Sequence, residues 1–125
     1  MLAGDFYIVN DYKQEANIVK AVLELNAAHE IFAGHFPRQP VVPGVCMMQM
    51  IKDLAEQALD KKLNLARADD MKFLALIDPV ANNIIQAELK YTEGEEDKIH
   101  VTASLSKDAL IHFKFKGSFI QQPAF

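Results

Sequence analysis

Hydrophobic and polar positions alternate along much of this chain, and in one stretch the hydrophobic positions recur at helical spacing instead. Between residues 16 and 26 a period-two pattern places four apolar side chains on one side, as in a half-buried strand. Three later segments alternate in the same way. The apolar positions of the four segments are Val19, Ala21, Leu23 and Leu25; Ala87, Leu89 and Tyr91; Ile99, Val101, Ala103 and Leu105; Ile111, Phe113 and Phe115.

Two more strands and the connections between strands follow from weaker signals. Residues 5–12 have the character of a short edge strand, and residues 71–80 contain a strand that Asp78 and Pro79 end. Turn-forming residues separate the later strands at positions 92–96 and 106–108. Residues 61–70 carry so many charged side chains that they are predicted to form a connection rather than a strand.

One long helix interrupts this series of strands. Pro43 and Gly44 open it, because proline suits a helix start where its missing N–H would have no intrahelical partner. Apolar residues then cover most of the helix circumference as far as Leu59 or Asp60, which is typical of a helix surrounded by other elements. The remaining polar stripe is interpreted as solvated and consists of Gln49, Asp53, Glu56 and Asp60.

These elements predict an α+β fold in which an antiparallel sheet wraps around one long central helix. The order is two strands, the helix and four strands, within a single domain spanning residues 1–125. A sheet covered by one helix leaves long strand edges exposed. Pairing of such edges between subunits predicts a dimer.

Composition narrows the range of functions. The chain has 125 residues, of which 50% are hydrophobic and 24% charged, and its net charge of −4 argues against binding to nucleic acid. No apolar run approaches the roughly 20 residues that span a bilayer. The single cysteine, Cys46, cannot form an internal disulfide, and the first residues lack the pattern of a signal peptide. We therefore expect a cytoplasmic protein.

The stretch just before the helix resembles a known family signature. The letters GHFP at 34–37, Pro40, and VPGV at 42–45 are similar to the motif of the β-hydroxyacyl-acyl-carrier-protein dehydratases of the FabA/FabZ type, which have the hotdog fold. The resemblance implies a dimer with two sites at its interface and an acyl thioester substrate. Phosphopantetheine would enter as part of that substrate, from acyl carrier protein, and no separate cofactor is expected.

The resemblance also implies roles for individual residues. His35 would act on the Cα proton, the backbone N–H of Gly44 would polarise the thioester carbonyl, and the carbonyl of Val41 would orient the His35 ring. Phe36 and Val45 would contact substrate. An N–H at a helix N-terminus stabilises charge that develops on the thioester oxygen, and histidine exchanges protons near neutral pH. The family's acid, on the helix of the other protomer, would act on the β-hydroxyl that leaves as water.

The chain departs from the family at that acid, because position 49 is a glutamine. An amide cannot release a proton as a carboxylic acid does. Asp53 stands where family members usually carry glutamine, so the amide and the carboxylate are exchanged. Four explanations remain open: Asp53 acts as a relocated acid, a related acid-bearing subunit completes the site in a heterodimer, the chain binds acyl groups without turnover, or it is an acyl thioesterase.

Other candidate residues have simpler interpretations. Cys46 is either a thiol with a pKa lowered by the helix N-terminus or a small buried hydrophobe. His29, His100 and His112 form no ligand-like group with acidic residues or cysteine, so no metal site is expected. Arg38 and Lys72 could receive the acidic carrier protein. The sequence as a whole predicts a dehydratase-like protein of fatty-acid or polyketide-type synthesis.

Overall fold

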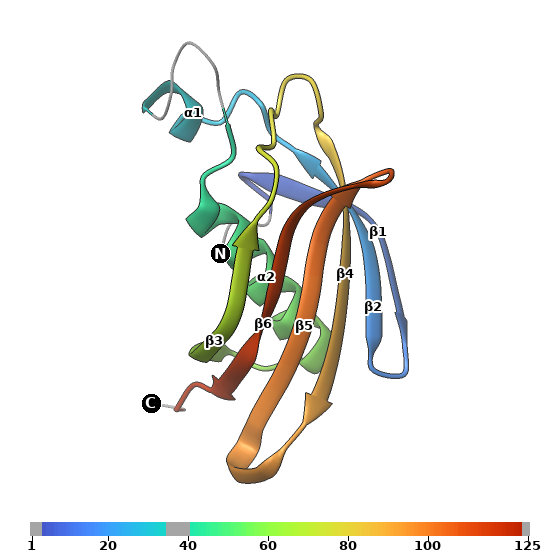
Figure 1. Cartoon of the computed structure of the whole chain (residues 1–125), viewed down its shortest axis with the longest axis vertical. Coiled ribbons are helices and arrows are strands. Elements are labelled where there is room, and N and C mark those ends of the chain that lie inside the picture. The colour runs from blue at the N-terminus through green and yellow to red at the C-terminus, as the bar shows by residue number, and fades with distance from the viewer. Residues whose placement is uncertain (1–3, 35–40, 124–125) are drawn as a thin grey trace.

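The computed structural model describes residues 4–34 and 41–123, and within them the chain folds as one curved sheet against a long helix. Figure 1 shows α2 lying along one face of the sheet, with β1 at one edge and β3 at the other. The elements in chain order are β1 (Tyr7–Glu15), β2 (Ile18–Leu25), α1 (Ile31–Gly34), α2 (Gly44–Leu59), β3 (Leu63–Phe73), β4 (Ile84–Glu93), the 3-10 turn η1 (Glu95–Asp97), β5 (Lys98–Lys107) and β6 (Leu110–Gln121).

The six strands of the described chain lie in the order β1-β2-β4-β5-β6-β3, and every neighbouring pair is antiparallel. This confirms the predicted α+β architecture with one long helix. The strands predicted by alternation are present, and the side chains predicted to be apolar and inward on β2 and β5 are buried. Their period of two places one face of each strand against α2.

Helix α2 runs from Gly44 to Leu59, as its periodicity predicts. Pro43 is its N-cap, and the carbonyl oxygen of Pro43 accepts hydrogen bonds from the N–H groups of Cys46 (3.0 Å) and Met47 (3.2 Å). Asp60 ends the helix in the left-handed conformation, with φ 52°. The apolar side chains that α2 contributes to the core are Cys46, Met47, Met50, Ile51, Leu54 and Ala55.

The prediction of a charged connection over residues 61–70 is wrong, because these residues form most of β3. Only Leu63 of β3 is buried, and the strand is bonded on one side alone, to β6. Charged side chains are common on an edge strand, where they face solvent. The strand predicted within 71–80 ends earlier than Asp78 and Pro79, at Phe73, after which Leu74 donates its N–H to the carbonyl of His112 (2.8 Å).

The predicted alternation of β6 also needs correction at its start. Leu105 of β5 faces Phe113, but the next residue, Ser106, faces Ile111, so His112 is an extra residue that forms a β-bulge. The bulge turns Ile111 outward (36% exposed) and buries His112 (1% exposed). The inward-facing series of β6 therefore begins at Phe113 rather than at Ile111.

Candidate active site

Two of the predicted site residues, His35 and Phe36, lie outside the described residues, as does Arg38. Their assigned roles stay predictions. The structure does describe α1, whose last residue, Gly34, directly precedes His35 in the sequence. It also describes Val41 and the whole of α2. The candidate site is therefore built from the segment before His35 and from the helix that follows it.

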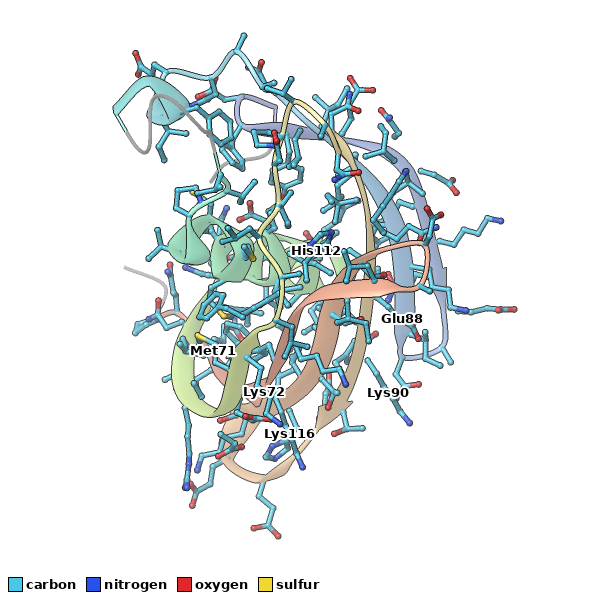
Figure 2. All side chains as sticks on the ribbon, turned by 45° about the horizontal axis from the view of Figure 1, so that its top comes forward. Met71, Lys72, Glu88, Lys90, His112 and Lys116 are labelled. Carbon is cyan, nitrogen blue, oxygen red and sulfur yellow. The ribbon has the colours of Figure 1, made fainter. Side chains whose placement is uncertain are left out.

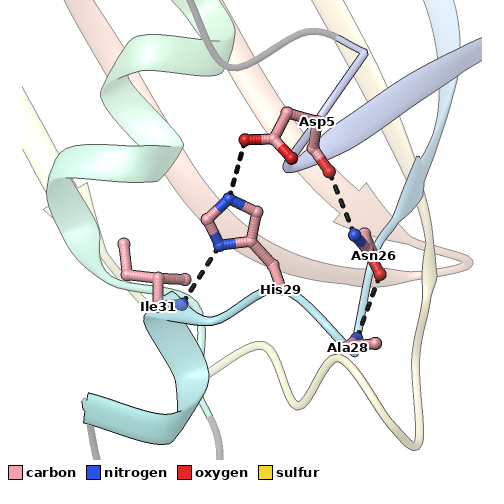
Figure 3. Close-up of polar contacts among 5 residues, drawn as sticks. All are labelled: Asp5, Asn26, Ala28, His29 and Ile31. Atoms are coloured by element: carbon pink, nitrogen blue, oxygen red, sulfur yellow. Dashed lines mark hydrogen bonds and ion pairs between the residues drawn. The ribbon is translucent and has the colours of Figure 1, made fainter.

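His29 fixes the start of α1, as Figure 3 shows. Its Nδ1 accepts the N–H of Ile31 (3.1 Å), so the ring carries its proton on Nε2 and donates it to Oδ2 of Asp5 (3.1 Å). The ring also packs edge-on against Phe6, with centroids 5.4 Å apart. His29 thus acts as an anchor that ties the segment leading to His35 to the N-terminal part of the chain.

The first turn of α2 lines an apolar cavity of about 400 Å³. The first N–H groups of a helix have no intrahelical acceptor, so the N–H of Gly44 is suited to bind a carbonyl oxygen. Phe73 closes one side of this turn: a Cβ added at Gly44 would come 2.9 Å from its ring. A larger residue at position 44 would therefore require the Phe73 ring, which is 53% exposed, to shift. The cavity is lined by Val41, Val42, Pro43, Gly44, Met47, Phe73, Leu74, Ala75 and Leu76.

The two valines predicted to contact substrate differ in exposure. Val41 is 7% exposed and lines the cavity at Gly44, whereas Val45 is 78% exposed. The backbone beside Val41 is fixed, because Val42 donates its N–H to the carbonyl of Ile77 (2.9 Å). The structure thus brings Val41 and Gly44 together and leaves Val45 on the surface of this chain.

One turn further along the helix, the residue at the position of the family acid, Gln49, belongs to a hydrogen-bonded group of three side chains. Gln49 donates from Nε2 to Oδ1 of Asp53 (2.8 Å), and the hydroxyl of Tyr7, on β1, donates to Oδ2 of the same carboxylate (3.0 Å). Asp53 is 3% exposed and Tyr7 1%. Gln49 is half-buried, so it is the one residue of this group of three that another molecule can still contact.

The interpretation of the polar stripe as solvated is wrong for two of its four residues. Asp53 is buried beneath Tyr7, and Glu56 is buried because its Oε2 accepts the N–H of Leu63 at the start of β3 (2.9 Å). Asp60 is exposed. Burial of a carboxylate is costly unless donors satisfy it, and here the donors come from β1 and β3.

Tyr7 is a site residue that the sequence reasoning missed. Burial, and then the neighbouring carboxylate of Asp53, raise the pKa of the Tyr7 hydroxyl well above its usual value. Tyr7 therefore stays protonated and donates to Asp53 across the whole neutral range. The only signal in the sequence is a tyrosine on a predicted edge strand, which by itself does not reveal a partner 46 positions away.

A second cavity, of about 450 Å³, lies where α2 ends. Tyr7 and Asp53 line it, and the exposed Lys61 and Lys62 also contribute to its wall. Its lining residues are all of polar or charged type, and it is distinct from the apolar cavity at Gly44, which the first turn of the same helix lines. The Tyr7–Asp53 pair thus borders this second cavity at the end of the helix opposite to Gly44.

Three other candidates are placed by the structure. Burial raises the pKa of the Cys46 thiol, so the thiol is a small buried hydrophobe rather than an activated nucleophile. Within residues 4–34 and 41–123, no group of His, Cys, Asp and Glu is arranged to hold a metal ion. Lys72 is exposed, and its Nζ lies 3.6 Å from Oδ2 of Asp70. Figure 2 shows it on the same sheet face as Lys90 and Lys116, away from α2.

In the described part of the chain, no helix has the length and apolar character needed to cross a bilayer. The longest helix is α2, with 16 residues.

Comparison with known proteins gives consistent results. A family model described as ApeI-like, ApeI dehydratase, matches residues 11–112. The 3-hydroxyacyl-[acyl-carrier-protein] dehydratase FabZ of Listeria welshimeri is 28% identical over 102 residues, covering 76% of this chain and 71% of the relative. FabZ of Rickettsia akari is 24% identical over 115 residues, covering 90% and 74%.

A solved structure supports the fold independently. A chain of the dehydratase heterocomplex ApeI:P from Xenorhabdus doucetiae superposes with a TM-score of 0.73 at 22% identity, covering 91% of this chain and 97% of that chain. At this identity the likeness shows the fold alone. The predicted hotdog architecture is confirmed.

Proposed function

This chain belongs to the ApeI-like family of hotdog dehydratases, and from that premise we propose that it binds 3-hydroxyacyl thioesters of acyl carrier protein as one subunit of a dehydratase. The second subunit is a related hotdog protein that supplies the missing carboxylic acid. The observation that carries the proposal is Gln49, an amide at the family's acid position, held by the buried carboxylate of Asp53.

The reaction divides its tasks between the two subunits. His35 removes the Cα proton, and the electron pair of that C–H bond forms the Cα=Cβ double bond. The Cβ–O bond breaks, and the oxygen leaves as water after taking a proton from the related subunit's acid. The N–H of Gly44 stabilises the charge that builds on the thioester oxygen, at a helix start where no intrahelical acceptor competes.

The contacts of Asp53 weigh against its use as a relocated acid. Its two oxygens accept hydrogen bonds from Tyr7 and Gln49, and the side chain is 3% exposed. It lies about 6 Å further along the helix axis than Gln49. Misplacement of a catalytic group by even ~1 Å can cost about 10²-fold in rate. Asp53 is better suited to hold Gln49 than to protonate a substrate.

The exposed apolar side of β3 supports the need for a second subunit. Leu65, Met71 and Phe73 are 43%, 36% and 53% exposed, although each lies opposite a buried phenylalanine of β6, on the side of the sheet that faces α2. β3 is an edge strand with an unpaired side. A subunit that pairs with this edge would cover these side chains. The similarly folded chain from Xenorhabdus doucetiae belongs to a heterocomplex, which favours a related subunit as the partner of this chain.

The decisive experiment measures conversion of a 3-hydroxyacyl-carrier thioester to the enoyl product by mass spectrometry. The chain alone is expected to be slow, and addition of an acid-bearing related subunit should raise the rate. Substitution His35→Ala in this chain should abolish the activity of the mixture. Full activity of the chain alone, or activity that survives His35→Ala, would overturn the proposal.

A second experiment restores the acid within this chain by the substitution Gln49→Glu. The carboxyl introduced by Gln49→Glu would lie beside Asp53, and the neighbouring negative charge favours its protonated form. A general acid contributes about 10²–10⁴-fold, so turnover of the chain alone should rise by at least ~100-fold. Gln57→Glu, on an exposed position of the same helix, is the matched control and should change nothing. An equal effect of both substitutions would contradict the assignment of position 49.

Binding without turnover is the second candidate function, and the amide at position 49 favours it. It predicts that the chain binds the acyl thioester but that no acid-bearing subunit increases conversion. A thioesterase would instead release free acid in the same assay. Binding without turnover leaves only the mass of the substrate, whereas a thioesterase produces the mass of the free acid.

A further inference from the structure

We infer that Asp53 and Tyr7 fix the orientation of the Gln49 amide, so that this site recognises the 3-hydroxyl of an acyl group by accepting its proton in a hydrogen bond. The inference rests on the proposed function for the ligand class, a 3-hydroxyacyl thioester. It assigns Asp53 and Tyr7 as positioning residues and gives Gln49 a binding role in place of an acid's role.

The orientation of the amide follows from the chemistry of its partner. A carboxylate only accepts hydrogen bonds, so the side of the amide that faces Asp53 at 2.8 Å must be the NH₂ group. This assignment does not depend on distinguishing nitrogen from oxygen by position, because the opposite orientation would place two acceptors in contact. The carbonyl oxygen Oε1 is then the polar atom that Gln49 presents on its other side.

Tyr7 stabilises this orientation of the Gln49 amide by holding its partner, Asp53. Its hydroxyl donates to the second oxygen of Asp53 at 3.0 Å, and burial keeps that hydroxyl protonated. Both oxygens of Asp53 thus accept hydrogen bonds, which fixes the carboxylate in place between β1 and Gln49. Asp53 is therefore held from β1 on one side, and holds α2's Gln49 on the other.

An acceptor at position 49 has a defined chemical preference. A hydroxyl can donate to Oε1, whereas a saturated acyl chain or a double bond at the same place cannot. A ligand that covers Oε1 without donating to it would remove water from that oxygen and leave it unpaired, so a ligand that carries the hydroxyl should bind more tightly than one that lacks it. The site thus discriminates hydroxylated acyl groups without supplying a proton for their dehydration.

The test compares two pantetheine ligands of one length, 3-hydroxyoctanoyl and octanoyl, with an amide in place of the thioester. Binding is measured by calorimetry to the His35→Ala protein, which removes turnover. The hydroxylated ligand is expected to bind about three- to tenfold more tightly, as one hydrogen bond predicts. Asp53→Asn allows the Gln49 amide to turn either way and should reduce the preference to less than about twofold.

Matched controls separate positioning from damage to the fold. Asp60→Asn and Tyr12→Phe change the same residue types at the exposed C-cap of α2 and on β1, and should keep the preference. General damage would weaken both ligands equally and leave their ratio unchanged. If Asp53→Asn does not fold, Tyr7→Phe decides, because it removes one donor and should reduce the ratio.

The outcomes distinguish this inference from the proposed function. Equal affinity for both ligands in the His35→Ala protein, or a preference that neither Asp53→Asn nor Tyr7→Phe reduces, overturns the inference alone. Failure of both ligands to bind overturns the proposed function and the inference with it.

Discussion

Tyr7 and Asp53 join the first strand to the middle of the long helix through one hydrogen bond of 3.0 Å between two buried side chains. A hydrogen bond to a charged group contributes about 1.5–3 kcal/mol to stability. The pair therefore does more than orient Gln49: it also fixes β1 against α2. Its effect on stability depends on pH, because one of its members is a phenol.

Alkaline pH should weaken the native state through Tyr7. In the unfolded chain the phenol loses its proton near its ordinary pKa of about 10. In the folded chain its pKa is raised, so above pH 10 the native state holds a proton that the unfolded state has released. Stability is then fully present below pH 10 and falls as pH rises, by up to about 1.4 kcal/mol per unit from this group. Urea unfolding at several pH values measures the slope.

Tyr7→Phe isolates this contribution. It should cost about 1–2 kcal/mol at pH 7, because Asp53 loses one donor, and it should flatten the decline above pH 10. Tyr12→Phe is the control: this half-buried phenol donates to the exposed, uncharged Gln14, and its loss should cost less than about 0.5 kcal/mol. An identical alkaline slope in the Tyr7→Phe protein and in the native chain would contradict the assignment.

At the level of single residues, the sequence predicts chemistry better than burial. The resemblance to the dehydratase family shows Gln49 and Asp53 to be an exchanged amide and carboxylate. Whether they face solvent depends on Tyr7, which is 46 positions away from Asp53 and reaches it only because β1 lies beside the helix. Helical periodicity describes one element, so it cannot show which polar residue another element covers.

The pairing of β3 with β6 depends on a glycine. Gly117 lies opposite Ala68, next to the irregularities that shift the register of β3. A Cβ at position 117 would collide with the backbone carbonyl of Arg67 and with the ring of Phe115. Backbone cannot move aside as a flexible side chain can. β3 can therefore approach β6 closely only where the side chain is absent.

Gly117→Ala should destabilise the protein by about 2–3 kcal/mol, as overpacking of a tight contact does. The urea midpoint should fall with no change in the slope of the transition, because the same surface is exposed on unfolding. Lys116→Ala, one residue away on an exposed position, is the control and should stay within about 0.5 kcal/mol of the native chain. Equal stability of both variants would show that β3 is not held against β6 at this point.

Alternation of apolar and polar residues predicts the strands that are bonded to a neighbouring strand on both sides. β2, β4 and β5 each have one buried face, so their apolar positions repeat every two residues. The alternation does not predict residues 63–70 of β3, because ten of the eleven residues of this strand are exposed and its charges hide the period. The start of β6 was placed on the wrong face because the bulge at His112 adds a residue, which no pattern of period two can express.

At the scale of the whole molecule, the two edges of the sheet differ. The edge strand β1 has few exposed apolar side chains. The edge strand β3 has three on the side that faces α2, namely Leu65, Met71 and Phe73. Buried phenylalanines lie opposite these three on β6, so the apolar layer of the core continues to the edge and stops there. A second subunit would extend this layer. The dimer predicted from the sequence is therefore expected to form along β3 rather than along β1.

Met71→Lys tests this arrangement. Lysine is similar to methionine in length, so the isolated chain should keep its stability, but its charge would lose hydration inside an interface at a cost of several kcal/mol. Association of the chain, with a second copy or with the related subunit, should weaken by at least about tenfold in sedimentation equilibrium. Ile18→Lys is the matched control, because Ile18 is 37% exposed, close to the 36% of Met71, but lies on β2, which is paired on both sides. Equal association of both variants would place the interface elsewhere on the molecule.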